Sequence, residues 1–226
     1  MLKSGEMKKI KKMAVVFDMD GVVSDTQTLH AQVEEKMLRH YGIKITAKKI
    51  TEKYAGVPDN VCFTEIFKEY KVKVNLDKFI AEKWKKVLSL ARKNVSPIEG
   101  SIKLINDLKK AKFKLGLASS SPLRFIKLVL SKLKLQHEFN AISSGEEVKR
   151  GKPHPDIFLL TAKKLNVRPD LCVAIEDGKS GMVAAKAAKM RCVGLVTTKE
   201  GKYPADLIVT SLYQLSTKII KKLLEK

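Results

Sequence analysis

The chain has few cysteines, few aromatic residues and no long apolar run. Among its 226 residues are three cysteines, and aromatic residues make up 6%. Cys62, Cys172 and Cys192 are odd in number and lack a metal-ligand spacing, so we expect small buried thiols. No apolar run is long enough to cross a bilayer, and the basic segment 1–12 lacks the apolar core of a signal peptide. These absences favour a cytoplasmic protein without a membrane partner.

Acidic residues are scarce relative to basic ones. Lysine and arginine total 45 against 24 aspartate and glutamate, which gives a formal charge of +21. Nucleic-acid binding would account for such a charge, but the lysines are scattered in ones and twos without interleaved aromatic residues. Only segments 8–12 and 218–226 are clustered. We therefore expect a solvated surface that helps to recruit anionic substrates, and no nucleic-acid partner.

A short apolar run ends in two acidic residues. Residues 13–17, Met-Ala-Val-Val-Phe, are typical of a buried parallel strand. Asp18 and Asp20 follow directly, and Gly21 allows the chain to turn away. Two carboxylates this close repel each other, and a metal ion or a shared proton must relieve the repulsion. An ordinary acidic turn is the alternative.

The rest of the chain divides into a helical part and an alternating part. Helical patterns cover 29–41, 47–54, 60–69 and 76–90, and no strand is predicted between 26 and 95. Beyond Gly100, strands and helices alternate. The strands are predicted at 114–118, 139–143, 171–175, 192–196 and 206–209, and the helices at 101–112, 123–133, 155–165, 181–189 and the C-terminus. This order predicts an α/β fold with a Rossmann-like parallel sheet, formed by 1–25 and 96–226 and interrupted by a small α-helical cap at 26–95.

Polar residues follow the predicted strands. Ligands bind beyond the carboxyl ends of parallel strands, so these residues should meet at one edge of the sheet. They are Asp18 and Asp20 after the first strand, Ser119, Ser120 and Ser121 after the second, Lys152 in a later loop, and Glu176 and Asp177. Four carboxylates together require a divalent cation such as Mg²⁺. Serine and lysine donors suit a phosphate group.

These motifs carry a family resemblance. Residues 17–26 resemble the first motif of the haloacid dehalogenase superfamily, with the sequence Phe-Asp-Met-Asp-Gly-Val-Val-Ser-Asp-Thr. The serine, lysine and Glu-Asp loops resemble the other three motifs, in order, over nearly the whole chain. Two further features resemble the β-phosphoglucomutase-like and phosphoglycolate phosphatase-like subgroup. One is the position of the helical insert, and the other is the pair of motifs Gly-Lys-Pro-His-Pro-Asp-Ile-Phe and Glu-Asp-Gly-Lys-Ser-Gly-Met.

The resemblance implies a role for each matching residue. Asp18 would be the nucleophile that forms an aspartyl-phosphate. Asp20 would be the general acid and then the general base. Phosphoryl oxygens would be held by Ser119, Ser120 and Lys152, and backbone amides near Gly21 and Ser120 would complete the phosphate site. Mg²⁺ would be held by four acidic residues, namely Asp18, Asp20 through its backbone carbonyl, Glu176 and Asp177.

The cap decides the substrate, and its signals are weaker. By resemblance, substrate contacts are expected at His30, Gly56, Asp59 and Lys83. A surface or capping role is the alternative for His30, and a solvated side chain is the alternative for Lys83. Tyr54 and Trp84 are expected in the cap core. Mutases of the subgroup carry a phosphate-binding arginine where this chain has Asp59, which argues against a two-phosphate intermediate.

The sequence therefore favours a Mg²⁺-dependent phosphatase that acts on a small phosphorylated metabolite such as a sugar phosphate, as a monomer or weak dimer. A β-phosphoglucomutase-type hexose-phosphate mutase is the first alternative. Phosphonoacetaldehyde hydrolysis is another, and it needs a Schiff-base lysine that the cap sequence does not identify. An inactive basic nucleic-acid-binding protein is the alternative outside enzymes, and the intact Asp18, Asp20, Lys152 and Asp177 argue against it.

Overall fold

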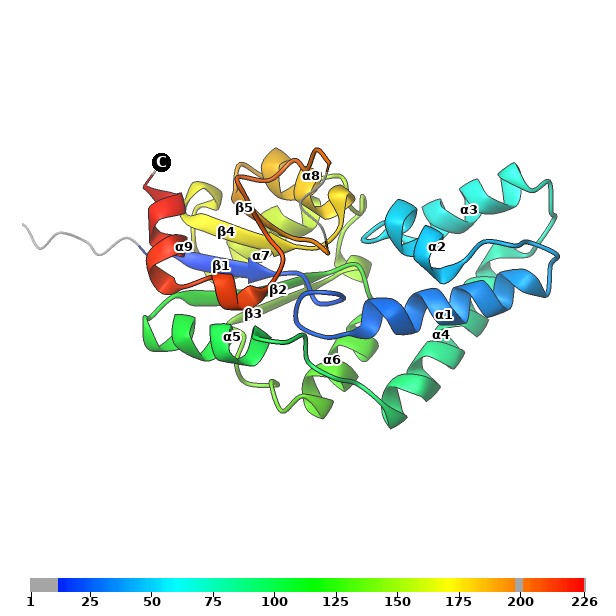
Figure 1. Ribbon diagram of the computed structural model, residues 1–226, viewed down its shortest axis with the longest axis horizontal. Coiled ribbons are helices and arrows are strands. Elements are labelled where there is room, and N and C mark those ends of the chain that lie inside the picture. Colours follow the sequence, from blue (N-terminus) through cyan, green and yellow to red (C-terminus); the bar gives the residue numbers. More distant parts are fainter. Residues whose placement is uncertain (1–11, 198–200, 226) are drawn as a thin grey trace, which may run out of the picture.

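A parallel sheet forms the centre of the molecule (Figure 1). The computed structural model describes residues 12–197 and 201–225, so most of the basic N-terminal cluster lies outside the described residues. Within these ranges the sheet has six strands in the order β3-β2-β1-β4-β5-β6. The strands are β1 Ala14–Phe17, β2 Lys114–Ser119, β3 Ala141–Ser144, β4 Cys172–Glu176, β5 Arg191–Leu195 and β6 Leu207–Val209. All pair in parallel, which confirms the predicted α/β fold.

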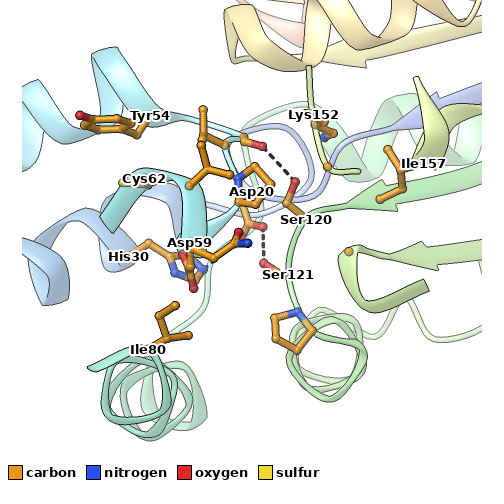
Figure 2. A pocket seen from close by; sticks show the side chains of 18 of the residues that line it. Asp20, His30, Tyr54, Asp59, Cys62, Ile80, Ser120, Ser121, Lys152 and Ile157 are labelled. Carbon is orange, nitrogen blue, oxygen red and sulfur yellow. Dashed lines mark hydrogen bonds and ion pairs between the residues drawn. The ribbon is translucent and has the colours of Figure 1, made fainter. Parts of the chain in front are cut away.

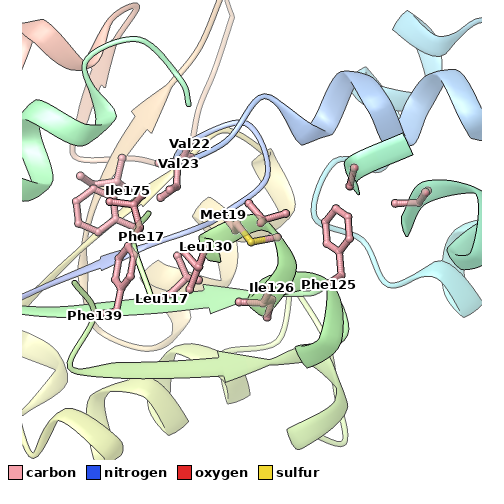
Figure 3. Packing of buried hydrophobic residues seen from close by; sticks show 14 of the residues in the cluster. Phe17, Met19, Val22, Val23, Leu117, Phe125, Ile126, Leu130, Phe139 and Ile175 are labelled. Atoms are coloured by element: carbon pink, nitrogen blue, oxygen red, sulfur yellow. The ribbon is translucent and has the colours of Figure 1, made fainter. Parts of the chain in front are cut away.

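Helices cover both faces of the sheet. The core helices are α5 Ser101–Lys110, α6 Leu123–Lys132, α7 Asp156–Leu165, α8 Lys179–Ala187 and α9 Thr217–Leu224. Val15 and Phe17 of β1 belong to a core that includes residues of α5, α6 and α9 (Figure 3), whereas Ala14 and Val16 pack with α7 and α8. Alternate residues of one strand thus supply two cores, as expected for a sheet buried on both faces.

Four helices between β1 and α5 form the inserted cap, which lies beyond one end of the sheet (Figure 1). They are α1 Thr26–Arg39, α2 Ala47–Tyr54, α3 Asp59–Glu69 and α4 Leu76–Lys93. Their own apolar centre includes Phe63, Phe67 and Phe79, with ring centroids of Phe79 at 4.8 and 5.0 Å from the other two. We propose 26–95 as the cap and 1–25 with 96–226 as the core.

The predicted elements occur close to their predicted positions. The helix predicted at 101–112 ends at Lys110, and the helix predicted at 181–189 spans Lys179–Ala187. Both end early because Lys112 and Lys189 adopt a positive φ, a conformation that a lysine in the sequence does not indicate. All three cysteines are buried and free, as expected. None of the helices in the described ranges is long and apolar enough to span a membrane.

Candidate active site at the sheet edge

The acidic residues meet because β1 pairs with both β2 and β4. Phe17 lies beside Leu117 on one side and Ile175 on the other. The residues that follow, Asp18 and Glu176, therefore leave the sheet at the same edge. The backbone amide of Asp18 donates a hydrogen bond to the Ile175 carbonyl at 3.0 Å, which continues the strand pairing up to the carboxylate.

Lys152 lies at the centre of this edge. Its Nζ is 2.5 Å from Asp18 Oδ1 and 2.5 Å from Glu176 Oε1, and it donates to the Ala118 carbonyl at 3.2 Å. The side chain is only 1% exposed. Three acceptors match the three donors of an ammonium group, so Lys152 is buried as a satisfied cation. We call Asp18, Lys152 and Glu176 the core triad.

The acidic residues around the core triad fit a divalent cation. Asp18, Glu176 and Asp177 offer ligand oxygens that lie within 4.8 Å of one another. A side chain at Gly21 would overlap the Asp177 carboxylate, and one at Gly181 would overlap Glu176, so glycine permits this close approach. The Asp20 side chain does not join the cluster, and the role predicted for its backbone carbonyl stays a prediction. Hard oxygen donors of this kind are the ligands of Mg²⁺ and Ca²⁺.

The electrostatics also favour a cation. Burial raises the pKa of Asp18 well above its usual range; Lys152 opposes the shift, and the nearby acidic residues add to it. Burial and the charge of Glu176 likewise raise the pKa of Asp177 to about 8. Protons or a metal ion must therefore offset the negative charge of this edge.

Asp20 has a separate set of partners. Its Oδ2 accepts hydrogen bonds from Ser121 at 2.9 Å and Ser119 at 3.3 Å. Its Oδ1 accepts one from Thr26 and lies 3.5 Å from Nε2 of His30. Burial would raise its pKa, but the contacts with His30 and the hydroxyl groups outweigh burial and lower the pKa of Asp20 to about 2. In this arrangement Asp20 is a carboxylate.

The sequence assigned no role to Ser121 or Thr26. The signal that could have identified them is local: Ser121 ends the run of three serines, and Thr26 ends the first motif. Each places a hydroxyl on Asp20, one from the core loop and one from the first turn of α1. Together they hold this carboxylate between core and cap.

The predicted phosphate-binding serines have protein partners. The Ser119 hydroxyl donates to Asp20 and accepts from the Ser121 amide at 3.1 Å. The Ser120 hydroxyl donates to the Gly56 carbonyl of the cap at 3.0 Å (Figure 2). The backbone amide of Gly21, predicted to lie near the phosphate, donates to the Ser24 carbonyl at 2.8 Å. Phosphate binding by these groups would require an exchange of partners.

A cavity of about 650 Å³ lies between the core and the cap. Figure 2 shows Asp20, Ser120 and Ser121 from the core side, with His30 and Asp59 from the cap. The cavity is lined by Asp18, Asp20, Ser120 and Lys152, and by all four cap residues that the sequence singled out, His30, Gly56, Asp59 and Lys83. Tyr54 and Trp84 also line it, although they are at most 8% exposed and pack in the core as predicted.

Two alternative interpretations of cap residues are wrong. Lys83 is not a solvated lysine: it is 3% exposed, forms an ion pair with Glu34 at 2.8 Å and forms another with Asp59. His30 is not a surface residue: it is 7% exposed, and its ring packs edge-on against Trp84 at 5.1 Å. We call Glu34, Asp59 and Lys83 the cap triad.

Sequence reasoning missed Glu34. It lies one helical turn after His30 on α1, so both side chains share one face of the helix. A glutamate four residues after His30 is the signal that could have identified it. Whether any carboxylate of a helix faces a cavity depends on the helix packed against it, and the sequence does not show that partner.

Comparisons with known proteins identify the family. A family model described as haloacid dehalogenase-like hydrolase matches residues 15–195. The chain belongs to this family. A phosphorylated carbohydrates phosphatase from Thermotoga maritima is 34% identical over 84% of this chain and 88% of its own length. Hexitol phosphatase B from Escherichia coli is 29% identical over 91% of this chain and 95% of its own.

A solved structure agrees with this assignment. The crystal structure of a β-phosphoglucomutase from Clostridium difficile has a TM-score of 0.82 and 30% identity to this haloacid dehalogenase-like hydrolase, and the match covers 95% of this chain and 97% of that chain. The resemblance to the β-phosphoglucomutase-like subgroup is confirmed, and so is the expectation that the protein is an enzyme.

Proposed function

We propose that this protein is a Mg²⁺-dependent phosphatase that hydrolyses a small phosphomonoester, such as a sugar phosphate, through an aspartyl-phosphate on Asp18. The observation that carries the proposal is the core triad: a buried lysine 2.5 Å from each of two carboxylates, with Asp177 beside them, at the end of a cavity. The phosphatase names of the two curated relatives support it.

Asp18 would supply the nucleophilic oxygen. The Lys152 ammonium favours the ionised form of Asp18 against the effect of burial, and the ionised form is the one that attacks phosphorus. The same ammonium would lie next to the phosphoryl oxygens and offset their charge during in-line transfer. The bond between phosphorus and the leaving oxygen breaks as the bond to Asp18 forms.

Asp20 would move the protons. As general acid it gives a proton to the leaving alkoxide, and as general base it takes one from the water that attacks the aspartyl-phosphate. Its low pKa suits the second step. The first step needs a proton on Asp20, whose Oδ1 lies 3.5 Å from Nε2 of His30. Release of Asp20 from Thr26 and Ser121 when substrate enters would raise its pKa.

The metal ion would be bound by Asp18, Glu176 and Asp177 with the Asp20 backbone carbonyl. When bound, Mg²⁺ would neutralise negative charge on the carboxylates and on the phosphoryl group. Burial, together with the charge of Glu176, raises the pKa of Asp177, and that charge supports a site in which a cation takes the place of a proton.

A mutase is the second candidate, because one structural neighbour is a β-phosphoglucomutase. A mutase must hold a second phosphate in the cap while the first is exchanged. Asp59 stands at the mutase arginine position, and its charge would repel that phosphate. Phosphonoacetaldehyde hydrolysis needs a neutral lysine amine, whereas the flanking carboxylates outweigh burial and raise the pKa of Lys83.

The test is phosphate release from a panel of sugar phosphates, phosphoglycolate and nucleotides, with Mg²⁺ and with a chelator. We expect turnover of a sugar phosphate only with Mg²⁺. Full turnover in chelator would contradict the proposed metal site. With β-glucose 1-phosphate and a trace of the bisphosphate, free phosphate should accumulate; rapid formation of glucose 6-phosphate without phosphate release would establish the mutase instead.

Three further expectations remain predictions. They are a cytoplasmic location, a monomeric or weakly dimeric state, and the lack of a nucleic-acid partner. A gel shift at moderate salt tests the last, since a lysine-rich surface that binds a nucleic-acid backbone would retard the probe.

A further inference from the structure

The cap triad lines the cap side of the cavity, and no step of the proposed chemistry uses it. Glu34 comes from α1, Asp59 from α3 and Lys83 from α4, and all three line the cavity. Lys83 is 3% exposed and Glu34 is 8% exposed. A buried charge cluster on the cap side of the cavity is placed to contact the part of the substrate that does not react.

The donors of Lys83 are already engaged. One N–H points to Glu34 at 2.8 Å and another to Asp59, and Nζ lies 4.7 Å from the ring centroid of Trp84 in a cation–π contact. An ammonium group has three donors, so Lys83 has little left to offer a phosphate. A lysine locked in this way neutralises its neighbours and does not bind an anion.

The carboxylates have acceptor capacity left. Lys83 engages one oxygen of Glu34 and one of Asp59, and each carboxylate has about four lone-pair sites. Two carboxylates against one ammonium also leave the triad with a net charge of −1. Such a surface accepts hydrogen bonds from hydroxyl groups, and it repels a phosphate that carries about −1.5 to −2 charges.

The spacing of the lining residues along α1 suits a small molecule. His30 lies 3.5 Å from Asp20 at the reacting end, and Glu34 is four residues further along α1, about 6 Å along the helix axis. A phosphoryl group near Asp18 would thus place the hydroxyls of a short carbon chain beside Glu34.

We propose that the cap triad selects a neutral, polyhydroxylated leaving group and excludes substrates with a second phosphate. This inference rests on the proposed phosphatase function and specifies its substrate class. A purely structural triad that only ties α1, α3 and α4 together is the competing explanation, and it predicts no change in substrate preference when charge is removed without loss of shape.

The experiment compares Glu34→Gln, Asp59→Asn and the double variant with wild type. The probes are sorbitol 6-phosphate, fructose 1,6-bisphosphate and 4-nitrophenyl phosphate, which has no hydroxyl chain. Glu65→Gln is the matched control: Glu65 lies in the same cap, pairs with Lys53 at 2.8 Å and lies outside the cavity lining. Circular dichroism verifies that each variant is folded.

We expect wild type to favour sorbitol 6-phosphate over the bisphosphate in kcat/KM by about tenfold or more, the effect of one charge-assisted hydrogen bond. Each single variant should reduce that ratio, and the double variant, whose triad has a net charge of +1, should reverse it. The ratio of sorbitol 6-phosphate to 4-nitrophenyl phosphate should fall in both single variants. Glu65→Gln should leave both ratios at the wild-type value.

Unchanged ratios in folded variants, or a wild type that uses the bisphosphate as well as sorbitol 6-phosphate, would overturn the inference. Calorimetric binding of the same two sugar phosphates gives the preference without turnover. A protein that binds sorbitol 6-phosphate with the expected preference but hydrolyses none of the three probes contradicts the proposed function and supports the selectivity of the cap triad.

Discussion

Two parts of the molecule contain the same buried arrangement, a lysine between two carboxylates. In the core triad Lys152 joins Asp18 to Glu176, and in the cap triad Lys83 joins Glu34 to Asp59. Both lysines have a raised pKa, because their carboxylate partners outweigh the effect of burial. The difference between the triads lies in what surrounds them.

The core triad has a third acid, and the cap triad has aromatic rings. Asp177 brings the core to three carboxyl groups against one ammonium, a net charge of −2 when all three are ionised, in a place where oxygens converge on one point. Beside Lys83 lie the rings of Trp84 and Phe63, at 4.7 and 5.7 Å. For identical residue types we therefore propose metal-assisted chemistry in one place and recognition of a leaving group in the other, because excess charge and geometry differ.

The largest expected effect is the loss of the core carboxylate. Asp18→Asn keeps the size of the side chain but removes the attacking charge, so kcat should fall by about 10⁴-fold or more. Phosphate release under saturating Mg²⁺ measures it, and circular dichroism shows whether the fold is kept. Asp18→Asn activity within tenfold of wild type would exclude the covalent mechanism and remove the proposed difference between the triads.

Removal of the two lysines should affect stability unequally. Lys152→Met leaves three carboxylates, the buried Asp18 and Glu176 and the half-buried Asp177, without a cation and should cost roughly 3–5 kcal/mol in the free energy of unfolding. Lys83→Met should cost less, because it leaves two carboxylates and the Asp59 side chain keeps 20% exposure. Urea denaturation measures both. Mg²⁺ should recover part of the loss for Lys152→Met only, and equal recovery in both variants would argue against a metal site restricted to the core.

The pH dependence of stability should reveal the protonation of Asp177, the acid beside the core triad. The pKa of Asp177 rises from 3.8 to about 8 in the folded protein, so the metal-free native state holds a proton that the unfolded chain releases above about pH 4. The free energy of unfolding should therefore fall as pH rises from about 4 to 8. The lowered pKa of Asp20, about 2, makes the free energy of unfolding rise with pH, but only below about pH 4.

Urea denaturation of metal-free protein at several pH values tests this slope. Saturating Mg²⁺ should flatten it, because the cation takes the place of the proton, and Asp177→Asn should flatten it without metal. A metal-free protein whose stability rises across this range would contradict the predicted origin of the slope.

The smallest expected effect concerns the link between the two regions. Ser120→Ala removes the hydrogen bond from the core to the Gly56 carbonyl of the cap and should cost about 1 kcal/mol. Thermal unfolding measures it against Ser131→Ala, an exposed serine of α6. Equal melting temperatures for the two variants would show that this contact contributes nothing to the attachment of the cap.

The sequence by itself determined the sheet, the inserted helices and the residues at the sheet edge. Asp18, Glu176 and Asp177 could be predicted to meet because each follows an apolar run, and parallel strands share one carboxyl end. Lys152 could be predicted to join them only from the motif around it, because it does not directly follow a predicted strand. The succession of strands along the chain and the motifs that follow them are local in sequence, so they can be recognised without coordinates.

Only the tertiary structure decided the partners within the cap and around Asp20. Lys83 is 24 residues from Asp59 in sequence, and their contact depends on how α3 and α4 pack. Helical periodicity shows that a face is apolar, but it does not show which neighbour covers it. The burial of His30, the pairing of Lys83 and the bond from Ser120 to Gly56 all depend on contacts between elements distant in sequence, and the free energy of those contacts exists only once the helices are packed.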